Sequence, residues 1–226
     1  MAQQKLIDRT LWIFGPSMCR AHDVQEEQGW PFKLANKIKC SYKNFAEVAA
    51  DNFFIYSSYL ENKKHISSND IVVIGWSHPS RKSFVFDDTN LVHRKILDKS
   101  LVYEQPNRKF IRSYNPINDS FFKWANLFPK SSGNKFYDTW FKNYYSDYEQ
   151  ECNLQSYYDS VKLTCKGQYI AFFFDKQSIV NIDVTGVGFM LEFVTENQVY
   201  INKNNMHLNP TGHTLWADHL NNCIKL

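Results

Sequence analysis

The alternation of apolar and polar segments predicts a chain in which short buried strands alternate with helices. Residues 10–14 and 71–75 are continuous apolar runs, and the second is rich in β-branched residues, which is typical of a central parallel strand. The run 169–174 is expected to form a third buried strand. A further strand is expected around residues 41–45 and a short one at 190–194.

Helices are expected between these strands, where apolar residues recur at helical spacing. The predicted helices are 30–38, a segment that runs through Ile55 and Leu60, 137–165, and 211–223. The pattern is weak over 84–134, which we interpret as an insertion or a lid containing a helix at 91–101. Strands that alternate with helices imply right-handed crossovers, so the chain is predicted to be a mostly parallel, three-layer α/β/α sandwich.

Composition narrows the class of protein. The chain has 226 residues and 43% hydrophobic content, which fits one globular domain spanning residues 1–226. The net charge of +3 is small and the basic residues are scattered, so no nucleic-acid partner is expected. The amino terminus does not resemble a signal peptide and no apolar run is long enough to span a bilayer, so we expect a soluble, cytoplasmic protein without a membrane partner.

The cysteines give no sign of a metal site. There are five, an odd number, and no pair has the spacing of metal ligands. They are expected to be mostly free thiols in a reducing compartment, and no metal or other cofactor is expected.

Three polar positions stand directly after predicted strands or before a predicted helix. Ser17 follows the turn Gly15-Pro16, Ser77 follows the strand 71–75, and His207 precedes the last helix. Ligands of open α/β sheets bind at the carboxyl ends of the strands, where such residues can converge. Ser17 is therefore either a helix cap or a nucleophile, and convergence with His207, a potential general base, favours the nucleophile.

Four blocks of the sequence, in this order, resemble the SGNH or GDSL hydrolases. They are Phe14-Gly15-Pro16-Ser17, residues 44–52, Gly75-Trp76-Ser77, and His207-Leu208-Asn209-Pro210-Thr211-Gly212-His213. The resemblance covers nearly the whole chain, and the last block is the most specific. It implies a flavodoxin-like sandwich with a mostly parallel sheet of about five strands.

The resemblance also implies a reaction and the residues that carry it. Ser17 would attack an ester, His207 would be its base, and the oxyanion hole would combine backbone N–H groups of Ser17 and Ala49 with the side chain of Ser77. The preferred substrate class is an O-acetyl ester on a carbohydrate. The alternatives are an acyltransferase and an inactive or weakly active binding module.

Three positions depart from the family pattern. Pro16 replaces the Asp before the nucleophile, Ser77 replaces an Asn that donates to the oxyanion, and Asn204 replaces the Asp three residues before His207. An amide at Asn204 can orient the imidazole of His207 but cannot stabilise the imidazolium by charge. The sequence therefore predicts a Ser17–His207 dyad that Asn204 or a neighbouring group orients.

Further residues near the predicted edge are candidates for substrate contacts. Trp76 is predicted to stack on a sugar ring or to belong to the core, His78 to contact substrate or lie on the surface, and Arg81 to bind an anionic group or form an ion pair. His213 is expected to be structural, and Cys19 is a second nucleophile candidate that the block alignment does not favour.

Overall fold

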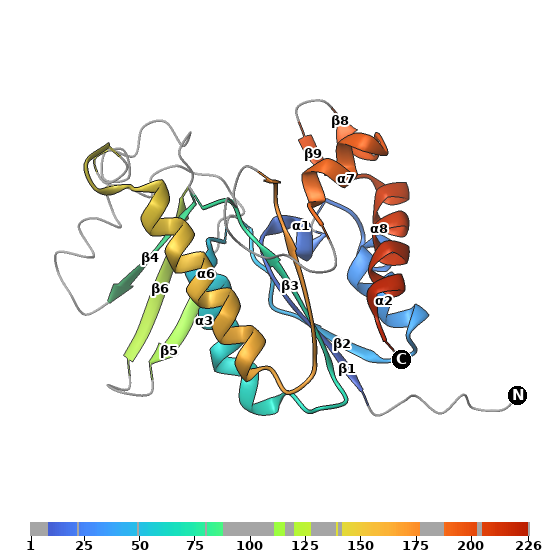
Figure 1. The fold of residues 1–226 in the computed structure, drawn as a ribbon, viewed down its shortest axis with the longest axis horizontal. Helices are drawn as coiled ribbons and strands as arrows, with labels where there is room; N and C mark the ends of the chain where they lie inside the picture. Colours follow the sequence, from blue (N-terminus) through green and yellow to red (C-terminus); the bar gives the residue numbers. More distant parts are fainter. Residues whose placement is uncertain are drawn as a thin grey trace, which may run out of the picture.

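A parallel sheet organises the chain, as the sequence predicts, and four of its strands lie in the described residues. The structure, a computed structural model, describes residues 9–21, 23–48, 50–79, 81–87, 111–115, 120–127, 139, 142–176, 188–202 and 205–225. The strands are β1 (Thr10–Phe14), β2 (Ser41–Asn44), β3 (Ile71–Trp76) and β7 (Gln168–Phe173), in the order β2-β1-β3-β7 (Figure 1). Phe189 forms one parallel bridge with Phe173 beside β7. The described residues thus supply four of the roughly five strands expected.

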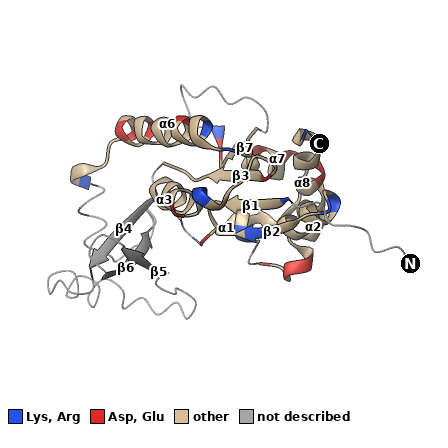
Figure 2. Cartoon of the chain, turned by 90° about the horizontal axis from the view of Figure 1, so that it is seen from below, with Lys and Arg blue, Asp and Glu red and all other residues tan. Residues whose placement is uncertain are grey.

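Helices cover both faces of this sheet, which confirms the three-layer sandwich. Helices α2 (Trp30–Lys37), α7 (Met190–Glu196) and α8 (Pro210–Cys223) pack on one face, and α3 (Asn52–Asn62) and α6 (Asp147–Thr164) on the other (Figures 1 and 2). Alternation along β1 explains the two cores, since Leu11 and Ile13 face the first layer whereas Trp12 and Phe14 face the second.

Two predicted elements differ from the structure. The expected strand at 190–194 is wrong, because these residues belong to α7. A strand would turn Glu192 to the same side as Met190 and Val194, whereas a helix buries those two residues and leaves Glu192 partly exposed. The long helix predicted over 137–165 is described as α6 from Asp147, where the hydroxyl of Ser146 caps the first turn.

The segment interpreted as an insertion or lid contains a second sheet. Strands β4 (Lys82–Asp87), β5 (Ile111–Asn115) and β6 (Ser120–Leu127) pair antiparallel in the order β4-β6-β5. The helix expected at 91–101 lies outside the described residues. The role of this segment as an insertion or lid stays a prediction.

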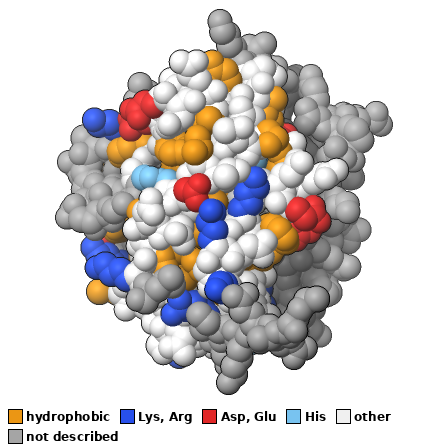
Figure 3. All heavy atoms as spheres, turned by 90° about the vertical axis from the view of Figure 1, so that its right-hand side faces the viewer, with side chains coloured by type: hydrophobic (Ala, Val, Ile, Leu, Met, Phe, Trp, Pro, Cys, Tyr) orange, Lys and Arg blue, Asp and Glu red, His pale blue; other side chains and the backbone are white. Residues whose placement is uncertain are grey.

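The remaining elements are short. They are α1 (Ser17–Arg20), the 3-10 helices η1 (Glu26–Gln28) and η2 (Lys63–His65), and the antiparallel hairpin of β8 (Tyr200–Asn202) and β9 (Asn205–Leu208). On the face viewed in Figure 3, basic, acidic and apolar side chains of the described residues are interspersed. Within the described ranges, none of the helices combines the length and the apolar character that crossing a membrane would require.

Candidate active site

The strand order places a topological switch point where β1 and β3 end. From β1 the chain goes outward to β2 and then returns to β3 on the other side of β1, so the connections diverge between these two central strands. Such a switch point is where open α/β sheets bind ligands. Phe14 of β1 is paired in register with Ile74 of β3, and Ser17 and Ser77 each follow three residues later. The two serines therefore leave neighbouring strands at the same edge.

Ser17 begins α1, but its hydroxyl does not cap that helix. The N-cap residue is Pro16, with no capping hydrogen bond from a side chain. The preceding Gly15 has a φ of 155°, and a Cβ there would lie 2.2 Å from the sulfur of Cys19. Glycine thus allows β1 to turn sharply and α1 to sit against the strand end. The capping interpretation of Ser17 is set aside, since its hydroxyl has another partner.

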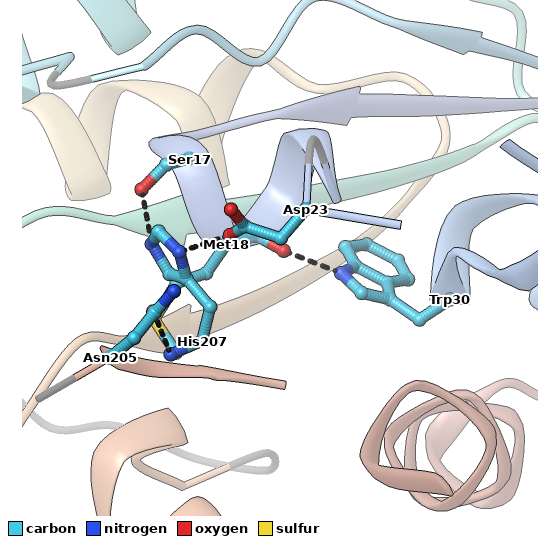
Figure 4. A network of polar contacts seen from close by, with 6 residues as sticks. All are labelled: Ser17, Met18, Asp23, Trp30, Asn205 and His207. Carbon is cyan, nitrogen blue, oxygen red and sulfur yellow. Dashed lines mark hydrogen bonds and ion pairs between the residues drawn. The ribbon is translucent and has the colours of Figure 1, made fainter. Parts of the chain in front are cut away.

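That partner is His207. The Oγ of Ser17 lies 2.9 Å from Nε2 of His207 (Figure 4). His207 stands on strand β9 and not, as predicted, on a loop. The side chain of Asn205 accepts the backbone N–H of His207 at 3.1 Å, and the next residue, Leu208, is buried. The hairpin therefore holds the imidazole against Ser17 although 190 positions separate the two residues in the chain.

A carboxylate meets the other side of the imidazole. Oδ2 of Asp23 contacts Nδ1 of His207 (Figure 4). A carboxylate at Nδ1 keeps a proton on that nitrogen, so the lone pair of Nε2 faces the hydroxyl of Ser17 and can accept its proton. Three segments thus bring a serine hydroxyl, an imidazole and a carboxylate into the order of contacts that a catalytic triad has.

Sequence reasoning missed Asp23. The family pattern places the acid three residues before the histidine, at Asn204, which lies outside the described residues. Asp23 lies instead six residues after Ser17, in the polar segment between α1 and η1. The available signal was a carboxylate so near Ser17 in the chain, where the turn after α1 can direct it back to the site.

Trp30 and His213 support the turn that carries Ser17. The indole Nε1–H of Trp30 donates to the carbonyl of Met18 at 2.9 Å, and the backbone N–H of Trp30 donates to Nδ1 of His213 at 3.3 Å (Figure 4 shows the first bond). Burial, together with the charge of Lys33, lowers the pKa of His213 to about 4. A neutral His213 thus joins α8 to the start of α2, in keeping with the structural role expected for it.

The segment after β2 is tied to α1. Arg20 forms an ion pair with Glu47, the backbone N–H of Glu47 donates to the carbonyl of Gly15 at 3.0 Å, and the amide of Asn44 donates to the carbonyl of Cys19, also at 3.0 Å. Ala49, the predicted oxyanion donor of this segment, lies outside the described residues. Its role stays a prediction.

Ser77 lies in a buried position at the end of β3. Its backbone N–H donates to Oδ1 of Asn52 at 2.7 Å, and its residue surface is 1% exposed. Its hydroxyl has no hydrogen-bond partner among the described residues. A buried hydroxyl without a partner is uncommon and calls for an explanation.

The prediction that Trp76 stacks on substrate is wrong in this structure. Trp76 is fully buried, and its indole N–H donates to the hydroxyl of Tyr169 at 3.0 Å. The period of two along β3 turns Trp76, like Val72 and Ile74, toward the core beneath α3 and α6. This is the core alternative raised from the sequence.

His78 and Arg81 lie beyond the ends of β3 and β7. Nε2 of His78 is 3.9 Å from Oδ2 of Asp175, and burial lowers the pKa of His78. The guanidinium of Arg81 packs over the ring of Phe174 at 5.4 Å. Burial lowers the pKa of Arg81 to about 10, and the charge of Asp51 opposes this change. Substrate contacts by His78 and Arg81 stay predictions.

The part of the chain that the structure describes contains no cluster suited to a metal ion, that is, no group of three or more His, Cys, Asp or Glu side chains. All five cysteines fall within that part and are free thiols, as expected. Cys19 is fully buried, and burial raises the pKa of its thiol, which argues against it as a nucleophile.

Comparison with known proteins finds similar solved structures. No protein-family model matches the chain, and no curated protein matches it. The chain is similar to a lipolytic protein of the G-D-S-L family from Veillonella parvula, with 11% identity, coverage of 93% of this chain and 95% of that one, and a TM-score of 0.47. It is also similar to the psychrotrophic esterase EstA from Pseudoalteromonas sp., with 9% identity, 96% of each chain covered, and a TM-score of 0.48. At such identities, function has to be argued from the site itself.

Proposed function

We propose that the chain is a serine esterase in which Ser17 is the nucleophile, His207 the general base and Asp23 the carboxylate that orients and charge-stabilises the imidazole. One observation carries this proposal: Nε2 of His207 lies 2.9 Å from Oγ of Ser17 while Nδ1 contacts Asp23. Nucleophile, base and orienting acid in this chain of contacts are what acyl transfer to a hydroxyl requires.

The mechanism follows from the two nitrogens of His207. Nε2 removes the hydroxyl proton as Oγ of Ser17 attacks the ester carbonyl, and the carbonyl oxygen becomes an oxyanion. His207 then returns the proton to the leaving alcohol, which departs and leaves an acyl group on Ser17. Water, deprotonated by the same imidazole, attacks the acyl group, and His207 returns that proton to Oγ of Ser17 as the bond to the acyl group breaks and the carboxylic acid leaves. Asp23 remains ionised throughout and stabilises the imidazolium that forms in both halves of the reaction.

The oxyanion would be held by the donors that the sequence blocks suggest. These are the backbone N–H groups of Ser17 and Ala49 and the hydroxyl of Ser77, whose burial without a partner is consistent with waiting for an acceptor. His78 and Arg81 remain candidates for contacts with the rest of the substrate. The resemblance of the sequence to SGNH hydrolases supports an O-acetyl ester on a carbohydrate as the substrate class, and the mechanism needs no cofactor.

Turnover of an activated acetyl ester tests the proposal. We expect wild-type protein to release the alcohol, and Ser17→Ala and His207→Ala to lose about 10⁴-fold or more in kcat. Absence of Ser17-dependent turnover would overturn the esterase and leave the binding module. If an added alcohol acceptor captures the acyl group in preference to water, the protein is an acyltransferase that uses the same triad.

A further inference from the structure

The side chain of Asn52 binds both backbone polar groups of Ser77. Its Oδ1 accepts the N–H of Ser77 at 2.7 Å, and its Nδ2 donates to the carbonyl of Ser77 at 3.1 Å. Asn52 is 7% and Ser77 1% exposed, so both bonds are protected from water. A planar amide that engages both groups fixes the orientation of the residue as well as its position.

These two hydrogen bonds lie just beyond the end of the β3–β7 ladder, where strand pairing no longer fixes the backbone. The β3–β7 ladder ends with Trp76 opposite Phe173, and the carbonyl of Trp76 accepts the N–H of Phe174 at 3.0 Å. Ser77 is the first residue beyond that ladder. Without Asn52, its buried N–H and carbonyl would lose these partners and its backbone angles would be less restricted.

Asn52 is itself firmly placed. It is the first residue of α3, and the N-cap residue Asp51 is 3% exposed and accepts the N–H of Phe54 on its side chain at 2.8 Å. The preceding Ala50 is fully buried. The start of α3 is therefore a rigid mount for the amide.

The hydroxyl of Ser77 is available to donate a hydrogen bond to a ligand. It is buried and has no partner among the described residues, although its backbone is fully bonded. It lies at the switch point, because Ser17 and Ser77 follow paired residues of adjacent strands. The close approach of α1 to β3 supports this proximity, since a Cβ on Gly75 would lie 2.4 Å from the sulfur of Cys19.

We infer that Asn52 is a positioning residue of the oxyanion site, which holds Ser77 so that its hydroxyl donates to the oxyanion of the tetrahedral intermediate. The inference rests on the proposed esterase function. Asn52 touches neither the substrate nor the reacting atoms and acts through Ser77. A purely structural amide would support the same fold but would not couple to the hydroxyl of Ser77.

A double-mutant cycle distinguishes a positioning role of Asn52 from a purely structural one. We expect Ser77→Ala to lower kcat about 100-fold, which is typical of removing one oxyanion donor. Asn52→Ala should lower kcat about 10- to 100-fold with KM changed less than about threefold, because a misplaced group weakens the transition state more than substrate binding. In the double variant, kcat should fall no more than about threefold below that of Ser77→Ala alone, because the amide then has no hydroxyl to position.

Asn62→Ala is the matched control. Asn62 lies at the other end of α3, where its amide donates to the carbonyl of Ser58 at 2.8 Å, and its loss should leave kcat unchanged. If Asn52→Ala does not fold, Asn52→Ser serves in the same cycle, because it adds no charge and its single short hydroxyl cannot engage both the N–H and the carbonyl of Ser77.

Two results would overturn the inference in an active wild-type enzyme: an unchanged kcat in the Asn52 variant, or losses that multiply in the double variant. Failure of the proposed function looks different, because the wild type itself would then have no Ser17-dependent turnover.

Discussion

At the scale of single residues, what the imidazole of His207 can do depends on which group contacts each of its two nitrogens. Ser17 meets Nε2 and Asp23 meets Nδ1, so the proposed acid comes from the segment of the proposed nucleophile and not from the hairpin that carries the histidine. The family pattern predicts no carboxylate for this histidine, since the expected position is Asn204. With Asp23 at Nδ1, the proposed mechanism does not need an amide to orient the imidazole.

Asp23→Asn tests that role. An amide keeps the shape but can stabilise the wrong tautomer and cannot stabilise the imidazolium, so we expect kcat to fall about 10²- to 10⁴-fold. Steady-state kinetics on an activated acetyl ester measures the loss. Glu27→Gln, a neighbouring exposed carboxylate of η1, is the control and should retain wild-type kcat. Equal activity of the two variants would show that Asp23 is not the acid.

His213 predicts how stability changes with pH. Its folded pKa of about 4 lies below the ordinary value of about 6.5, so the unfolded chain binds the extra proton first as pH falls. The free energy of unfolding that neutral His213 contributes is complete above about pH 6.5. It decreases by on the order of 3 kcal/mol as the pH falls toward 4. Urea unfolding of wild type and His213→Gln at pH 7 and pH 4.5 measures it. The variant should lose less stability on acidification, and an equal loss would contradict this assignment.

At the scale of elements, α1 is too short to be stable by itself. A helix of four residues cannot recover the cost of nucleation, so its place depends on tertiary bonds. The hydrogen bond from Trp30 to the carbonyl of Met18, the residue directly after Ser17, is one of these. The geometry of Ser17 should therefore depend on a side chain from α2.

Trp30→Phe removes that donor and keeps an aromatic ring. We expect the free energy of unfolding to fall by about 1–3 kcal/mol, because a buried carbonyl loses its partner, and kcat to fall several-fold as Ser17 shifts. Trp12→Phe is the matched control: it deletes an indole bond to Asp70 just before β3, at the sheet edge opposite the site. The control should lose stability without losing kcat. A similar kcat effect in both variants would sink the positioning role of Trp30.

Helices and strands whose apolar residues follow one clear pattern could be predicted from the sequence. Segments whose pattern fits both a helix and a strand could not. The strands β1 and β3 are buried on both faces and therefore read as continuous apolar runs. The short run in α7 fitted both periods, and only the packing of Met190 and Val194 settles it as a helix. The sequence predicts a loop at His207, and this is wrong because β9 gains its ladder from β8, a pairing that the local pattern does not reveal.

At the scale of the whole molecule, strand order determines what meets at the site. The order β2-β1-β3-β7 brings the ends of β1 and β3 together. The meeting of Ser17 with His207, and the place of Ser77 at the same sheet edge as Ser17, could be expected from the blocks in the sequence. Asp23 and the contact of Asn52 with Ser77 could not, because each depends on side-chain pairing across the fold and on the turn after α1. The sequence predicts that Trp76 contacts substrate or belongs to the core, and the alternation of side chains along β3 places it in the core.

The rate at which a fluorophosphonate probe modifies Ser17, followed by intact mass and peptide mapping at pH 7, tests the triad most directly. Wild type should gain one adduct on Ser17, and Asp23→Asn should react at least about 100-fold more slowly, because its base is weaker and wrongly oriented. No Ser17 adduct on the wild type, or an Asp23→Asn variant that reacts at the wild-type rate, would contradict the account.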